Sequence, residues 1–203
     1  MKKLTKQIVI EYHAFMAEKF DVKLIFRKGD IPQEVYDVFP SLNQFCNETI
    51  TVDTAFLNNY AITIPNPFGK TLIYLPWVAG VVTRVSLYNQ VRRLAHECQH
   101  AVQIKHEGDT HFAASYLGSP AMRANYESLA MHPELEIHFW YYGKPATAKT
   151  LSSMANKLKA YRCGADDIAV TEKHLVAYNK IVARGSVSSE AGKAAIGWLE
   201  ERV

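Results

Sequence analysis

The sequence predicts an α+β fold in which a small, mainly antiparallel sheet comes first and helices follow. The short β-branched runs typical of strands lie in the first eighty residues or so, and in "DVKLIFRKGD" apolar and charged residues alternate with the period of two that a strand requires. From about residue 83 to the end, apolar residues recur with helical spacing instead. Strands followed by helices, rather than alternating with them, are typical of an α+β domain.

The length, composition and net charge of the chain limit which kinds of protein it can be. The chain has 203 residues, 48% of them hydrophobic, which is enough to bury a core. We expect a main domain of residues 1–143 and a helical extension of residues 144–203 packed on it. The net charge of +3 argues against nucleic-acid binding. Three widely spaced cysteines fit a reducing compartment, and no apolar run is long enough for a membrane span, so we expect a cytoplasmic protein without a membrane partner.

In the first eighty residues or so, hydrophobic and β-branched patterns predict the following helices and strands in order. Residues 1–20 predict an amphipathic helix, and "DVKLIFRKGD" a strand that ends in a turn. "IPQEVYDVFPSLNQFC" has a helical pattern interrupted by Pro40. Three β-branched runs follow, "ETITVDT", "YAITI" and "KTLIYLP", and the prolines and glycine between the last two favour a hairpin.

The second part predicts helices only. A long helix over residues 84–106 should stop near Gly108, and the next should begin with Ser119 as its N-cap and Pro120 in its first turn. Pro133 should kink or restart that helix, which Gly143 then ends. Three more helical stretches are expected, over residues 150–162, 166–184 and 188–202.

The most specific motif is "RRLAHECQHAVQ", in which His96 and His100 bracket Glu97 in the order H-E-x-x-H. Two residues four apart lie about 40° from each other around a helix, so both imidazoles can reach one ion. The apolar residues of this stretch, such as Leu94, fall on the opposite side of the helical wheel. The pattern predicts a helix that packs on the core by one face and presents two metal ligands to a cleft by the other.

Glu97 has a separate role in this pattern. It lies about 100° around the helix from His96, close to the ion without being a ligand. A carboxylate there can take a proton from a water polarised by the metal and pass it to a leaving amine. We predict Glu97 as the general base and later the general acid of amide hydrolysis.

The motif carries a family resemblance. "LAHECQHAVQ" resembles the active-site helix of the zincin metallopeptidases, in which an aliphatic lead-in precedes H-E-x-x-H and small or apolar residues follow. The resemblance covers about residues 70–140. It implies that a preceding edge strand, here "KTLIYLP", binds the substrate in an extended conformation.

A catalytic zinc ion usually takes three protein ligands. "RANYESLA" places Glu127 about two turns into the helix that begins at Ser119, and it resembles the glutamate helix of the gluzincins, which implies Glu127 as the third ligand. His106 has the spacing of the metzincin ligand, but Gln103 replaces the helix-breaking glycine, which leaves His106 about 15 Å along the axis from His96. Four other side chains remain as alternatives: Glu134, Glu136, His111 and His138. Glu134 and His138, four residues apart, fit a solvated helix face better.

The sequence also offers side chains with less specific evidence for a role in the site. His111, in the loop predicted after the long helix, and Tyr116 or Tyr126 could donate a hydrogen bond to a developing oxyanion. Cys98 lies on the apolar face and fits a buried small hydrophobe. Cys46 would matter if the chain resembled the peptide deformylases, which add a cysteine ligand, but "QFCNET" lacks the glycine of their segment.

The prediction from sequence is a zinc metallopeptidase with zinc on His96, His100 and Glu127 and a peptide or protein substrate. Zinc is preferred over manganese or iron because of the ligand types. Two alternatives stay open. One is a non-catalytic binding or assembly protein on a zincin scaffold that meets a protein partner through residues 144–203. The other is a metal-dependent amidase acting on a small substrate.

Overall fold

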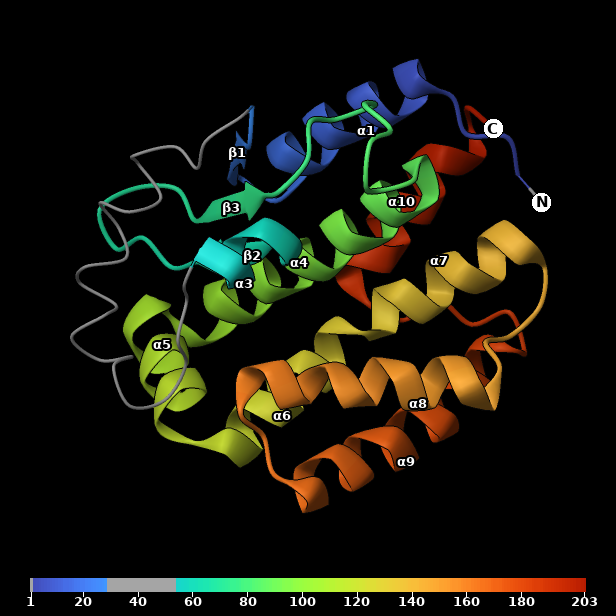
Figure 1. The fold of residues 1–203 in the computed structure, drawn as a ribbon. Helices are drawn as coiled ribbons and strands as arrows, with labels where there is room; N and C mark the ends of the chain where they lie inside the picture. The colour runs from blue at the N-terminus through green and yellow to red at the C-terminus, as the bar shows by residue number, and fades with distance from the viewer. Residues whose placement is uncertain (1, 29–53) are drawn as a thin grey trace.

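The structure is a computed structural model that describes residues 2–28 and 54–203, and it confirms the predicted α+β class. A three-stranded sheet and helix α1 (Lys6–Lys19) lie on one side of the long helix α4 (Leu87–Glu107), and later helices lie on its other sides (Figure 1). The helical pattern around Pro40, Cys46 and nearly all of "ETITVDT" lie outside the described residues. The last residue of that run, Thr54, begins a short helix, α3 (Thr54–Asn59).

The sheet is mixed, where the sequence predicted mainly antiparallel pairing. Its strands are β1 (Lys23–Phe26), β2 (Ile62–Ile64) and β3 (Leu72–Leu75), in the order β1-β3-β2. β2 and β3 are antiparallel, as the predicted hairpin requires, but β1 and β3 are parallel. A parallel pair needs a long crossover connection, and the chain between β1 and β3 is long enough to supply one.

The central position of β3 corrects a second prediction. "KTLIYLP" was expected to be an edge strand, yet its strand pairs on both sides and all four of its residues are buried. Among the described strands, the edge next to α4 is β2. The apolar run of β3 reflects burial on both faces of the sheet, a pattern that an edge strand with one solvated face does not need.

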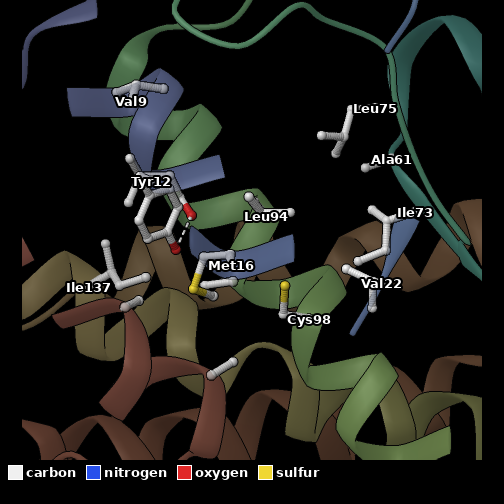
Figure 2. Packing of buried hydrophobic residues seen from close by; sticks show 14 of the residues in the cluster. Val9, Tyr12, Met16, Val22, Ala61, Ile73, Leu75, Leu94, Cys98 and Ile137 are labelled. Carbon is white, nitrogen blue, oxygen red and sulfur yellow. Dashed lines mark hydrogen bonds between the residues drawn. The ribbon is translucent and has the colours of Figure 1, made fainter. Parts of the chain in front are cut away.

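The largest core lies between the sheet, α1, α4 and α10 (Glu190–Glu200). Ile73 and Leu75 of β3 face this core together with Leu94 of α4, as Figure 2 shows for its central part. The alternate β3 residues, Leu72 and Tyr74, pack on the opposite face of the sheet in a smaller cluster. The side-chain period of two in β3 therefore divides its residues between two cores.

The helices after α4 follow the predicted signals with one addition. Asp109 and His111, expected in a loop after the long helix, lie in helix α5 (Asp109–Gly118). Ser119 caps the next helix, where its Oγ accepts a hydrogen bond from the Met122 amide at 3.2 Å. Pro133 starts a new helix rather than a kink, and Gly143 ends it with a φ of 68°. The bounds of the helices not yet named are α6 (Pro120–Ala130), α7 (His132–Tyr142), α8 (Ala148–Asn156), the 3-10 helix η1 (Lys157–Tyr161) and α9 (Ala165–Val182).

A second large core joins α6 and α7 to the helices after residue 144. It contains Met131 and Leu135 together with Leu151, Leu158 and Leu175. Residues 144–203 thus contribute to both large cores, because α10 returns to the first one. None of the helices in the described ranges combines the length and apolar character needed to cross a membrane.

Candidate metal centre

The two histidines of the motif lie on α4 with their rings together. The ring centroids of His96 and His100 are 4.9 Å apart, and the two residues are only 8% and 5% exposed. The sequence predicted that this face would line a cleft. It is instead largely covered, because β2, α6 and α7 all contact α4. Buried imidazoles need partners for their nitrogens, and these partners define the site.

Glu127 of α6 supplies the third group. Its Oε2 lies 3.3 Å from Nε2 of His96, and its Oε1 lies 3.3 Å from Nε2 of His100. Two donors that each lie about 2.05 Å from a tetrahedral zinc ion are about 3.3 Å apart. The ligand atoms of all three residues lie within 4.8 Å of one another, which among the described residues is the one such group of His, Cys, Asp or Glu. These residues could therefore hold a metal ion.

The other nitrogen of each imidazole also lies close to a side-chain oxygen. Nδ1 of His100 lies 2.7 Å from Oε1 of Gln103, whose amide nitrogen donates to the carbonyl of Tyr126 at 3.0 Å. That second bond fixes the amide orientation, so the Gln103 oxygen accepts from the imidazole. Nδ1 of His96 lies 2.8 Å from Oε1 of Glu134. Both rings are thus oriented with Nε2 toward Glu127, the arrangement by which outer groups position histidine ligands.

Glu134 is a correction to the sequence prediction, which favoured a solvated helix face for it. Its side chain is 3% exposed, and its Oε2 lies 2.7 Å from Nη1 of Arg92 and 3.7 Å from Nζ of Lys157. Burial would raise the pKa of Glu134, but Lys157, Arg92 and His96 hold it well below its usual range. The residue is an ionised carboxylate that supports His96 from the side opposite Glu127.

The charges of the donors are strongly coupled. Burial would lower the pKa of His96, but its hydrogen bonds to Glu127 and Glu134 raise it to about 10. Burial would likewise raise the pKa of Glu127, and the two histidines hold it far below its usual value. Two carboxylates thus bind a proton on His96 tightly. A divalent cation at the same donors would displace that proton.

Glu97 points to the strand side of the helix. Its Oε2 lies 2.7 Å and its backbone carbonyl oxygen 3.0 Å from Oγ1 of Thr63 in β2, so the one hydroxyl hydrogen of Thr63 is shared between these two acceptors. Burial raises the pKa of Glu97 in spite of the nearby His96 and His100. Thr63 was not singled out from the sequence, because a threonine in a three-residue strand carries no local signal of its partner.

A small cavity of about 60 Å³ lies beside these groups. His96, Glu97, Glu127 and Glu134 all line it. The other lining residues come from the turn before β2, from α4, from the end of α6 and from η1: Asn59, Tyr60, Ala61, Arg93, Met131, Lys157 and Tyr161. None of these residues was predicted from the sequence to belong to the site. Those of η1, for example, lie about sixty residues after the motif, and no spacing rule connects the two segments.

The residues predicted to help an oxyanion lie elsewhere. Tyr126 is buried and donates its hydroxyl to Glu107, and His111 is largely exposed, with Nε2 3.9 Å from the same carboxylate. Neither lines the cavity. Tyr116 donates to Oε1 of Glu127 at 2.5 Å and so contacts the candidate ligand itself. The oxyanion role of His111 and Tyr126 stays a prediction.

The remaining alternatives are separated from the group. α4 continues through His106, whose exposed side chain lies 3.1 Å from Glu190, so it cannot turn back to His96. Glu136 is buried but accepts hydrogen bonds from the amides of Ser188 and Ser189 at the start of α10. His138 lies 3.2 Å from the Tyr88 hydroxyl. Cys98 is fully buried in the first core, as predicted.

Comparison with known proteins adds no family to these observations. No family model matches the chain, and neither does any curated protein or solved structure. The resemblance to zincins therefore rests on the motif and on the buried group of His96, His100 and Glu127.

Proposed function

We propose that this protein is a zinc-dependent metallopeptidase of the gluzincin-like type, acting on a peptide or protein substrate. The observation that carries the proposal is that Nε2 of His96 and Nε2 of His100 each lie 3.3 Å from a carboxylate oxygen of Glu127. The Nδ1 atom of each ring lies within 2.8 Å of a side-chain oxygen on its other side. Two histidines and a glutamate are a known catalytic ligand set for zinc, which leaves a fourth position open.

Zinc bound there would act as a Lewis acid and lower the pKa of a coordinated water toward neutrality. Glu97 would accept the proton, since its carboxylate lines the same cavity and its pKa is raised by burial. Thr63 holds one oxygen of that carboxylate, which leaves the other for the proton transfer. Tyr161 of η1 lines the cavity and, with a pKa that burial raises well above its usual value, keeps its hydroxyl proton for donation.

The substrate would lie along β2 rather than β3. A peptide in extended conformation can add a strand to an exposed edge, and β2 is the described edge strand that contacts α4. Thr63 links that strand to Glu97, so a substrate paired with β2 would bring its backbone close to the general base. This placement replaces the role that the sequence suggested for "KTLIYLP".

The first test is the metal content of purified full-length protein. We expect about one zinc ion per chain in the wild type, loss of zinc in His96→Ala, and no change in His106→Ala, which alters an exposed histidine of the same helix. A wild type without bound zinc, or a His96→Ala variant that keeps it, would refute the proposed centre.

The second test separates catalysis from binding. Glu97→Gln should retain zinc and lose cleavage of a quenched fluorogenic peptide mixture by at least about 100-fold, the scale of general base catalysis. A variant with full activity would exclude Glu97 as the base. A wild type that binds zinc and cleaves no peptide would favour the two alternatives, a small-substrate amidase if simple amides are hydrolysed and a binding or assembly protein if they are not.

A further inference from the structure

Two cations line the candidate site. Arg93 lies on α4 three residues before His96 and four before Glu97, which puts it on the same side of the helix, one turn away. Lys157, the first residue of η1, lines the same cavity. Both are only partly exposed, and the side chain of Lys157 is 35% exposed compared with 2% for Glu127. They line the same cavity as His96 and Glu127, two of the three candidate ligands.

Arg93 differs from the other cations near the site in its partners. Arg92 and Lys157 both approach Oε2 of Glu134, at 2.7 Å and 3.7 Å. Within the described ranges no carboxylate pairs with Arg93, and its guanidinium lies over the ring of Trp77 at 5.9 Å. Arg92 and Lys157 thus share one carboxylate, whereas Arg93 has no carboxylate partner among the described residues. Partly buried charges are normally paired, so an unpaired guanidinium that lines a cavity marks a site for an anion.

We propose that Arg93, assisted by Lys157, binds a carboxylate of the substrate beside the scissile amide, so that the enzyme selects acidic peptides. This inference rests on the proposed peptidase function. A guanidinium offers two parallel N–H donors to one carboxylate, and the cation over Trp77 is already held in place.

The spacing along the helix fits such a contact. One helical turn separates Arg93 from His96 and Glu97, about 5 Å along the axis. An extended peptide advances about 3.3 Å per residue. A carboxylate on the residue next to the scissile bond, or one residue further, would therefore reach the guanidinium. The same reach admits an acidic side chain or the free carboxylate at a peptide's C-terminus.

Binding can be measured without turnover. The probes are two hydroxamates, N-acetylglutamic acid hydroxamate and N-acetylglutamine hydroxamate, which offer the same metal-binding group and differ only in the side-chain charge. Calorimetric titration of the zinc-loaded full-length protein should give at least about tenfold tighter binding of the acidic compound, as expected for a charge-assisted bidentate pair.

Charge-removing variants assign that preference to residues. Arg93→Gln should reduce the ratio of the two affinities to within twofold, and Arg93→Lys should restore part of it. Lys157→Gln should reduce the ratio to a smaller extent, and it provides a second variant if Arg93→Gln fails to fold. Lys105→Gln, which removes an exposed charge from the same helix, should leave the ratio unchanged. Equal affinities in the wild type, a ratio that survives Arg93→Gln, or no binding of either probe would overturn the inference.

Peptide cleavage distinguishes the two sources of the carboxylate. Paired substrates with internal Glu or Gln and an amidated end report on the side chain, and paired free-acid and amidated peptides report on the C-terminus. A preference in either pair that Arg93→Gln removes supports the proposal and names the source. Cleavage without any preference contradicts the proposal while the peptidase function stands. Discrimination between the hydroxamates without any cleavage supports the anion site and counts against the peptidase.

Discussion

The zinc affinity of the metal-free protein should rise steeply with pH, well above the range in which an ordinary histidine titrates. Glu127 and Glu134 lie on either side of His96 and, against the effect of burial, raise its pKa to about 10. A metal ion that binds Nε2 of His96 must displace the proton held there. Between the ordinary pKa of 6.5 and the raised one, each added pH unit therefore weakens the competition of that proton with zinc about tenfold.

The magnitude follows from that window. While His96 stays mostly protonated, the apparent zinc affinity gains about tenfold, or about 1.4 kcal/mol, per pH unit. From pH 6.5 to 8.5 the expected gain is about 100-fold, whereas a histidine with a pKa of 6.5 would give only about twofold. Glu134→Gln removes one of the two carboxylates and should move the plateau to lower pH.

Competition with a chromophoric chelator of known zinc affinity measures this slope. Titrations at half-unit steps between pH 6.5 and 8.5 are sufficient, with the chelator's own proton competition subtracted. His106→Ala serves as the control for an exposed histidine of the same helix and should give the wild-type slope. An affinity that is flat above pH 7 would show that the carboxylates do not hold a proton on His96.

Three further predictions concern the surroundings of the site. Glu134→Gln should weaken the pH-independent zinc affinity, obtained by fitting the pH dependence of the same competition, by about 10- to 100-fold, since outer partners of histidine ligands contribute on that scale; an unchanged pH-independent affinity would show that Glu134 does not support His96. Gly192→Ala should lower the free energy of unfolding by about 1–3 kcal/mol or more in urea titration, because its Cβ would lie 1.7 Å from Oε2 of Glu136. Gly197→Ala on the same helix meets no atom within 4 Å, so it should be neutral or stabilising, and equal effects of the two would contradict the argument. In the metal-free protein, protonated His96 stabilises the folded state, because its pKa is about 10 there and 6.5 in the unfolded chain. This stabilisation is complete below pH 6.5 and is lost as the pH rises toward about 10, so calorimetry should show a falling melting temperature across that window.

The parts of the site that the sequence predicted are those fixed by helical spacing. His96, Glu97 and His100 lie on one helix, where four residues make about one turn, and the Ser119 cap with Pro120 sets the start of the helix that carries Glu127. The pairing of the two helices, however, could only be suggested by the resemblance to gluzincins.

The parts that were missed depend on contacts between distant segments. The sequence of its own helix predicts that Glu134 lies on the surface. Only the packing of α7 on α4 buries it beside His96. Lys157 and Tyr161 reach the cavity through a turn of 3-10 helix that has no motif. The order of the strands was likewise beyond local patterning, because an apolar run such as "LIYL" is compatible with any strand that is buried on both faces.

The candidate ligands lie on the boundary between the two large cores. α4 packs in the first core through Leu94 and Cys98, whereas the end of α6 and the start of α7 pack in the second through Met131 and Leu135. An ion held between α4 and α6 would thus act as a cross-link between two separately packed halves of the molecule. Its binding free energy would become folding free energy for both, about 2.7 kcal/mol at a free metal concentration one hundred times the dissociation constant. Metal supply would then set how cooperatively the chain unfolds as well as whether it can react.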